Sequence, residues 1–201
     1  MQQLASILSK NLPEAAVDYC TQLCVDYPFD FVLRKQRVTK LGDYRYDPIG
    51  NSHTITVNDN LNQYQFLVTY VHEVAHRAVH QHRSVQKPHG IIWKQKFQSL
   101  MLPLLRPDIF PDDVLRILAR HMKNPKASVG GDPKLAKVLS TYDANSADEL
   151  RLYDVDLGAE FLFRKRAFRK VEVKRTRAVC LDIQNGKRYF IPLMVAVQRL
   201  S

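Results

Sequence analysis

The segment Val71–His76 combines residue types that can bind and use a metal ion. It reads H-E-x-x-H, and on a helix His72 and His76 lie one turn apart on the same face. Glu73 projects about 100° round the helix, beside a bound metal rather than behind it. Two neutral imidazoles and a carboxylate that is not a ligand are the parts of a zinc hydrolase, in which the carboxylate acts as general base. We therefore predict Zn²⁺ at the two histidines and a catalytic role for Glu73.

A zinc hydrolase needs a third protein ligand, and three later histidines are candidates. His80 lies too far from the first histidine, because eight residues of helix rise about 12 Å. His82 reproduces the H-x3-H-x5-H spacing of metzincin proteases and YbeY-type endoribonucleases, in which a glycine breaks the helix. Val79 occupies that glycine position here, and because valine is poor at positive φ we expect the helix to continue past it and carry His82 away. His89, between a proline and a glycine at the start of a new apolar segment, is favoured, with His82 as the alternative.

The residues around the motif indicate a mostly buried helix. From Leu61 to Val79, apolar residues recur near helical spacing. Histidine and glutamate are costly to bury unless they are satisfied. A role in a metal site explains their presence better than a place in a plain core helix.

The motif and its sequel resemble the SprT family, which includes the Spartan proteases of DNA–protein crosslink repair. The chain has H-E-x-x-H, then a short polar loop, then H-G-x-x-W opening a second helix, and the resemblance runs from about Leu12 to Leu105. It implies zinc ligation by His72, His76 and His89, with Glu73 as the catalytic residue. It also implies a metallopeptidase whose protein substrate is bound or crosslinked to DNA.

The elements that must position these residues follow a zincin-like order. We expect a helix over 3–26, strands over 31–38, 41–47 and 53–57, the H-E-x-x-H helix, and a second site helix from Gly90 to about Leu105. This α+β arrangement fills a catalytic domain of residues 1–123. An edge strand should border the cleft and pair with substrate backbone, and we place it around Ile55. Cys20 and Cys24, one helical turn apart, are expected to be core residues rather than half of a metal site.

Several further side chains are candidates for the site. A stabiliser of the oxyanion is to be sought among Tyr44, Tyr46 and Tyr70, and His53 is a weaker candidate for a site role. Trp93 is expected to pack in the core rather than contact substrate.

The sequence after residue 123 differs in composition and pattern from the part that carries the motif. Residues 124–158 should form a linker with a short helix, and residues 159–201 a basic β-rich appendage with a two-residue hairpin turn at Asn185-Gly186. SprT relatives often carry a four-cysteine zinc ribbon here, but this appendage has only Cys180, so it resembles a zinc ribbon without its metal. Its cations are predicted to bind nucleic acid through the phosphate backbone; they are Arg164, Lys165, Arg166, Arg169, Lys170, Lys174, Arg175 and Arg177.

The amino-acid composition and charge of the chain indicate its partners and its compartment. The formal net charge is +10 and the pI about 9.6, which favours anionic partners, with nucleic acid first. No apolar run of about 18 residues occurs, so no membrane span is expected. The N-terminus lacks the pattern of a secretory signal, and the odd number of cysteines, three, favours the cytoplasm.

Two other readings remain open from the sequence. One is a nucleic-acid-binding zinc protein that does not cleave protein, which the presence of Glu73 argues against. The other is a YbeY-like endoribonuclease, which would need His82 as the third ligand.

Overall fold

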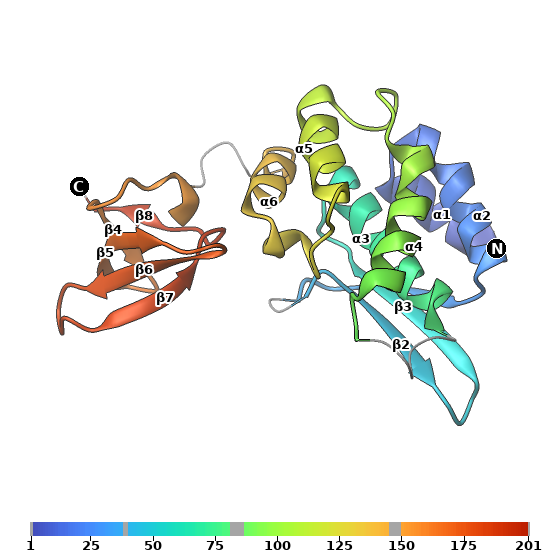
Figure 1. Ribbon diagram of the computed structural model, residues 1–201, viewed down its shortest axis with the longest axis horizontal. Helices are drawn as coiled ribbons and strands as arrows, with labels where there is room; N and C mark the ends of the chain where they lie inside the picture. Colours follow the sequence, from blue (N-terminus) through green and yellow to red (C-terminus); the bar gives the residue numbers. More distant parts are fainter. Residues whose placement is uncertain (1, 38–39, 81–86, 145–149, 201) are drawn as a thin grey trace. The chain divides into compact units, whose positions relative to one another are not determined.

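The computed structural model describes residues 2–37, 40–80, 87–144 and 150–200 of the chain (Figure 1). It divides into two compact units, Met1–Ala127 and Ser128–Ser201, each with a sheet of its own. Both helices and strands are present, as the α+β prediction required. None of the helices in these residues has the length and apolar character needed to cross a bilayer.

Two helices open the first unit. Helix α1 (Gln2–Asn11) is followed by the 3-10 turn η1 (Glu14–Ala16) and helix α2 (Val17–Asp26). Cys20 and Cys24 are free thiols buried on the inner face of α2, as expected of core residues.

The sheet of the first unit has the order β1-β3-β2. Strand β3 (Ser52–Asn58) runs parallel to β1 (Asp30–Arg34) and antiparallel to β2 (Gly42–Asp47). Ile55 pairs with Phe31 on one side and with Tyr44 on the other. The prediction of an edge strand around Ile55 is therefore wrong, because both sides of β3 are already paired. The strands at the two edges are β1 and β2.

Helix α3 (Gln63–Ala78) carries the H-E-x-x-H motif and packs against β2 and β3. Its first turn is capped by Asn62, whose side-chain oxygen accepts hydrogen bonds from Tyr64 N and Gln65 N at 3.1 and 3.0 Å. The helix ends at Ala78, so the expectation that it continues past Val79 is wrong. Val79 caps the helix with φ −100°, a conformation open to a β-branched residue, and no glycine is needed for the chain to leave the helix.

Two further helices complete the first unit. Helix α4 (Ile91–Met101) begins after Gly90 and passes into the 3-10 turn η3 (Leu102–Leu104), which contains Pro103. It packs against α3. Helix α5 (Asp112–Met122) begins directly after Pro111.

The second unit begins with short helical segments. The 3-10 turn η4 (Val129–Gly131) leads into helix α6 (Pro133–Ser140), the short helix predicted within residues 124–158. Asp132 caps α6 by accepting a hydrogen bond from Leu135 N at 3.3 Å.

A five-stranded antiparallel sheet forms the body of the second unit. Its order is β7-β6-β5-β4-β8. The strands are β4 (Glu160–Phe163), β5 (Arg166–Val173), β6 (Arg177–Asp182), β7 (Arg188–Pro192) and β8 (Gln198–Arg199). One face buries a core made of Leu152, Val155, Phe161, Phe168, Ala178, Cys180, Ile191, Leu193 and Val197.

The turn between β6 and β7 is longer than predicted. It spans residues 183–187 rather than two residues, and Gly186 adopts φ 68° within it. The carboxylate of Asp182 accepts hydrogen bonds from Gln184 N and Asn185 N at 2.9 and 3.2 Å. This side-chain acceptor stabilises a wider turn than a bare Asn-Gly pair would form.

Lys170 holds the segment before the sheet in place. Its side chain is only 3% exposed, although it belongs to the cation run that was predicted to meet nucleic acid. Its Nζ donates hydrogen bonds to the backbone oxygens of Leu152, Tyr153 and Val155 at 2.9, 3.3 and 2.5 Å. An ammonium with three backbone acceptors is a structural tie, so Lys170 is removed from the predicted nucleic-acid surface.

We predict that Lys170→Met destabilises the second unit by about 2 kcal/mol, because two buried carbonyl groups and a partly buried one lose their donor. Hydrogen–deuterium exchange of amides in residues 150–200 would then be about 30-fold faster. Lys187→Met, on an exposed side chain of the β6–β7 turn, is the matched control and should leave exchange unchanged. Equal exchange in the two variants would show that the Lys170 hydrogen bonds do not stabilise the unit.

Candidate metal centre

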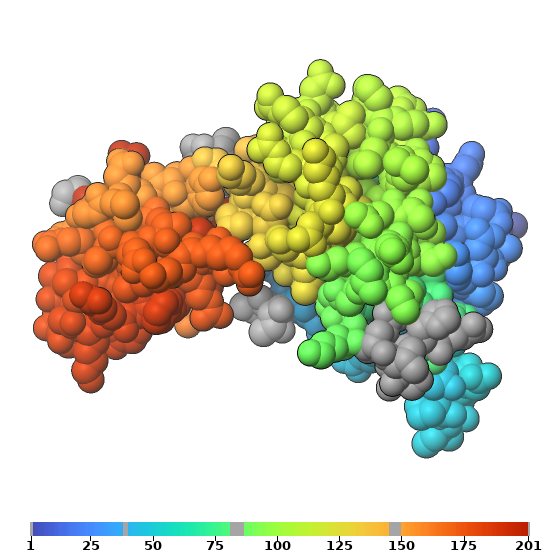
Figure 2. All heavy atoms as spheres, viewed as in Figure 1, coloured from blue at the N-terminus to red at the C-terminus, as the bar shows by residue number. Residues whose placement is uncertain are grey.

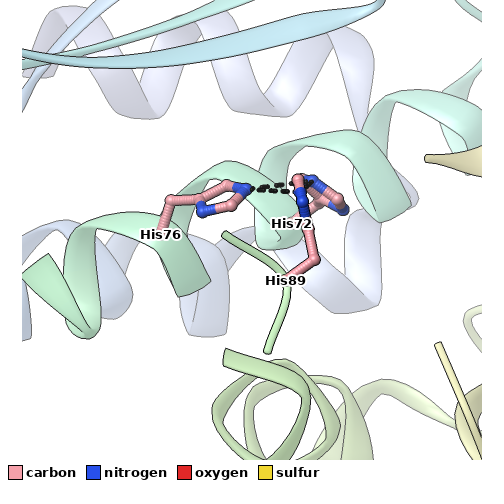
Figure 3. A group of neighbouring side chains, drawn as sticks. All are labelled: His72, His76 and His89. Atoms are coloured by element: carbon pink, nitrogen blue, oxygen red, sulfur yellow. Dashed lines mark hydrogen bonds between the residues drawn. The ribbon is translucent and has the colours of Figure 1, made fainter. Parts of the chain in front are cut away.

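Three histidine side chains converge at the end of α3 (Figure 3). The Nε2 atoms of His72 and His76 are 3.3 Å apart, those of His76 and His89 are 2.9 Å apart, and those of His89 and His72 are 3.2 Å apart. Among the described residues, these three form the one group of histidine, cysteine and acidic side chains close enough to hold an ion.

The local backbone explains the convergence. His72 and His76 face the same way because they are one turn apart on α3. His89 comes from the segment just before α4, and Figure 3 shows it reaching toward the two helical histidines. It adopts φ 59°, and a hydrogen bond of 2.9 Å from Gly90 N to Lys87 O closes the adjacent turn. A left-handed histidine is uncommon and costs free energy, so this backbone is held in place by its surroundings.

The donor set fits a zinc ion. Burial, followed by the neighbouring His76 and His89, lowers the pKa of His72 well below its usual range. Burial also lowers the pKa of His76 to about 4, and it lowers the pKa of His89. All three imidazoles are therefore neutral near pH 7, which is the form that binds metals. Tetrahedral coordination at about 2.05 Å would place the nitrogens about 3.3 Å apart, close to the spacing observed.

An apolar wall surrounds the ligands. Trp93 on α4 is 1% exposed, and its ring centroid lies 4.6, 5.2 and 4.6 Å from those of His72, His76 and His89. Phe97 stacks on Trp93 with ring centroids 5.0 Å apart and also lies against His72, at 5.5 Å. Trp93 is thus a core residue, as predicted, and at the same time the wall of the site. A low-dielectric wall strengthens electrostatic interactions inside the site.

Glu73 lies buried on the next face of α3. Burial raises the pKa of its carboxyl group to about 8, and the negative charge of Asp43 acts in the same direction. Arg37, Lys40 and a hydrogen bond from the backbone N–H of Tyr44 act in the opposite direction. A dication held by the histidines would add positive charge nearby and favour the carboxylate form.

Gly42 makes room for Glu73. A Cβ atom at this position would lie 2.7 Å from both Glu73 Oε1 and Thr69 Cγ2, closer than real Cβ contacts. Strand β2 can therefore lie directly over the carboxyl group only because Gly42 has no side chain. Sequence reasoning missed this residue; the available signal was a glycine at the very start of an alternating strand.

A pocket of about 350 Å³ lies beside the histidines. It is lined by Tyr44, Tyr46, His76, Val79, His80, Lys87, Pro88, His89 and Trp93. Its walls are mostly aromatic and basic, and they include no carboxylate. Strand β2, an edge of the sheet, contributes both tyrosines, so the pocket opens where the sheet has a free edge.

The remaining candidates are placed as follows. His80 does not join the ligands; its ring packs on Tyr46 with centroids 4.3 Å apart. His53 Nδ1 lies 2.8 Å from Tyr44 Oη. Tyr70 is excluded as an oxyanion stabiliser, because it is buried and its hydroxyl donates to Cys20 O at 2.8 Å. The alternative ligand, His82, lies outside the described residues.

One further residue near the site was missed from the sequence. His121 on α5 is buried, and its charge contributes to lowering the pKa of His72. The only signal was a histidine on the apolar stripe of α5, which also includes Val114 and Leu118.

Comparison with known protein families agrees with this geometry. The sequence model of the SprT-like family matches residues 14–108 of the chain, which include the three histidines, Glu73 and the sheet beneath them. Residues 14–108 therefore match the SprT-like family, as the motif predicted. No curated protein and no solved structure matches the chain. The SprT-like family is associated with metallopeptidase-type activity, and the histidine trio of this SprT-like domain can bind a metal ion.

The predicted nucleic-acid residues lie outside the SprT-like match, in the sheet of the second unit. Three of the exposed cations form ion pairs: Arg166 with Asp182, Arg169 with Glu160, and Lys174 with Glu172. Within the part of the chain that the structure describes, Arg164, Lys165, Arg175 and Arg177 are exposed and form no ion pair.

We predict that the purified protein binds about one zinc per chain and that His89→Ala loses it, because two imidazoles alone hold zinc weakly. His82→Ala should retain the metal. Elemental analysis of the three proteins after dialysis against a weak chelator measures this directly. Loss of zinc from His82→Ala with retention in His89→Ala would reverse the ligand assignment.

Proposed function

We propose that this chain is a zinc-dependent metallopeptidase of the SprT type. The observation that supports this most strongly is the convergence of three neutral imidazoles beside a buried glutamate, at the rim of a pocket. His72, His76 and His89 would hold the zinc, and Glu73 would act as general base.

A bound zinc ion would lower the pKa of a water molecule and polarise the substrate carbonyl. Glu73 takes the proton from the attacking water as the new C–O bond forms at the carbonyl carbon. The carboxyl group then gives this proton to the amide nitrogen, and the C–N bond breaks. The products are a carboxylic acid, which ionises, and an amine. Gly42 and the Tyr44 N–H keep the Glu73 carboxyl group at one place during both transfers.

Strand β2 supports an extended peptide as the substrate. It is an edge of the sheet, and its Tyr44 and Tyr46 line the pocket beside His76. A peptide that adds to this edge as a further strand would run past the histidines, with its side chains alternating between pocket and solvent.

DNA is the proposed location of that substrate. Residues 159–201 contain 11 lysines and arginines against 3 acidic residues, a net charge of +8. All of these cations except the buried Lys170 are exposed, and such a charge favours the phosphate backbone without reading the base sequence. The cleaved protein would then be one that is bound or crosslinked to DNA.

The turn between β4 and β5 adds a physical argument for this role. Its two residues, Arg164 and Lys165, have φ 51° and 64°. Two-residue turns with positive φ at both positions prefer Asn-Gly, and other side chains carry a cost there. Two exposed cations at a turn where they are unfavourable point to a use for their charge.

Two other functions are weaker. An endoribonuclease of the YbeY type would need His82 as a ligand, whereas the described residues already supply His89 within 3.2 Å of His72. A nucleic-acid-binding zinc protein without activity has no need for a buried glutamate beside the metal site.

We predict that Glu73→Gln abolishes proteolysis, with a loss of at least about 100-fold, because the amide cannot accept the proton from water. The zinc content should equal that of the wild type. Cleavage of denatured casein, followed by gel electrophoresis in the presence of DNA, gives the readout. Cleavage by Glu73→Gln at the wild-type rate would rule out the proposed mechanism.

We also predict that Arg164→Asn combined with Lys165→Gly has opposite effects on stability and binding. The second unit should gain about 1 kcal/mol, because Asn-Gly suits the turn. The slope of log K against log salt for a DNA duplex should fall by up to about two, one for each lost phosphate contact.

Lys10→Gln combined with Lys123→Gln removes two exposed cations from the first unit and serves as the charge-matched control. Fluorescence anisotropy over a salt series measures the slope. An equal fall in both variants would show that only net charge matters and that the turn is not a DNA contact.

A further inference from the structure

We infer that Tyr44 is a catalytic residue whose hydroxyl stabilises the oxyanion formed at the substrate carbonyl, and that His53 positions this hydroxyl. This inference rests on the proposed peptidase function. A hydrolase of this kind needs a hydrogen-bond donor aimed at the oxygen that gains negative charge.

The backbone of Tyr44 is fixed at the site. Its N–H donates a hydrogen bond to the carboxyl group of Glu73. Strand β2 cannot move outward without breaking this bond, and Gly42, two residues earlier, allows β2 to lie close over the carboxyl group. The Tyr44 side chain therefore starts from a defined position next to the general base.

The ring of Tyr44 faces the metal ligands. It lines the pocket together with His76 and His89. Its plane is parallel to that of His76 within 7°, with ring centroids 6.5 Å apart. Tyr44 and two of the histidines therefore border the same pocket, in which a substrate carbonyl would bind.

His53 can orient the Tyr44 hydroxyl. Its Nδ1 lies 2.8 Å from Tyr44 Oη, and the two rings stack with centroids 6.0 Å apart. With the proton on Nδ1, His53 donates to the phenol oxygen. A hydrogen bond donated to the phenol oxygen polarises the O–H bond and makes the Tyr44 hydroxyl a stronger donor toward a substrate oxyanion.

The other hydroxyl and N–H groups near the site are less suited to this task. Tyr46 donates its hydroxyl hydrogen to Asn51 Oδ1 at 3.0 Å. Tyr70 is buried and donates to Cys20 O. Trp93 Nε1 has no hydrogen-bond partner among the described residues. This atom is buried and out of contact with solvent, so it is less suited to meet a substrate oxygen than an exposed donor.

The test compares wild type with Tyr44→Phe in two ways. For cleavage of denatured casein by the zinc-loaded protein, kcat should fall about 100-fold or more, the usual cost of one oxyanion donor, while KM stays similar. The second readout is binding of two peptide inhibitors of equal sequence. A phosphinic peptide carries a tetrahedral centre with charged oxygens, whereas a thiol peptide does not. Tyr44→Phe should strongly weaken binding of the phosphinic peptide and hardly change binding of the thiol peptide.

His53→Ala tests the positioning role. His53→Ala alone should lower kcat. In a protein that already carries Tyr44→Phe, the same change should cause no further loss of kcat, because the Tyr44–His53 hydrogen bond is already gone. Tyr27→Phe, at a tyrosine outside the pocket, is the control for loss of a phenol hydroxyl.

The possible outcomes distinguish a failure of the Tyr44 assignment from a failure of the proposed peptidase function. Wild-type kcat and wild-type phosphinic affinity in Tyr44→Phe would overturn the role of Tyr44. If the wild type cleaved no protein, the proposed function would fail, and phosphinic binding would still decide whether Tyr44 contacts a tetrahedral oxyanion. Additive losses in the double variant would remove His53 from the proposal.

Discussion

The structure of the first unit depends on bringing three imidazole nitrogens to one point. Two of them come from one face of a single helix, so their spacing is set by helix geometry. The third comes from a separate segment, and the chain must leave α3, reverse, and begin α4 for His89 to face back. His89 meets this requirement with a left-handed backbone conformation. Its side chain points toward the two histidines of α3, and helix α4 begins two residues later. Without a metal, three close nitrogens gain little from each other, so the arrangement is best explained by an ion that they share.

A second constraint places the sheet over the carboxyl group of Glu73. Glu73 points from α3 toward β2, and the strand comes so close that only glycine fits at position 42. The same strand supplies Tyr44, whose N–H reaches Glu73 and whose ring lines the pocket. It is also an edge of the sheet. Two contacts of Glu73, one wall of the pocket and an edge of the sheet therefore belong to one short strand, and the tip of its hairpin with β3 projects from the surface in Figure 2. A change in the position of β2 would alter all three together.

The sequence predicted the parts of this site that depend on local spacing. The helix around His72 and His76, the new helix after Gly90 and the short helix from Pro133 follow from periodicity, prolines and glycines. Features that depend on long-range pairing were not accessible in this way. Ile55 alternates cleanly with polar neighbours, yet β3 is the central strand, because pairing partners far along the chain decide its position. The helix was expected to continue through Val79 because valine is strained at positive φ, which a glycine-type helix end would require. A helix can also end at negative φ, as α3 does. The tie between Tyr44 and His53 is formed by tertiary contact and has no signature in their spacing.

The second unit shows why a count of cations does not define a binding surface. Lys170 and Arg164 are six positions apart in the same basic run, yet one is buried and the other exposed. Lys170 donates to three backbone oxygens and so supplies inside this unit a positive charge that ties the Leu152–Asp154 segment to the sheet, a task that a structural metal performs in a zinc ribbon. Arg166, Arg169 and Lys174 are partly neutralised by acidic neighbours. Of the predicted nucleic-acid residues in the described part of the chain, those exposed without an ion pair therefore lie at the β4–β5 turn and around the turn after β5. At the first of these turns the positive φ angles of Arg164 and Lys165 carry a conformational cost, and the contact of the Arg164 guanidinium with the Phe163 ring, 5.2 Å from its centroid, offsets part of it.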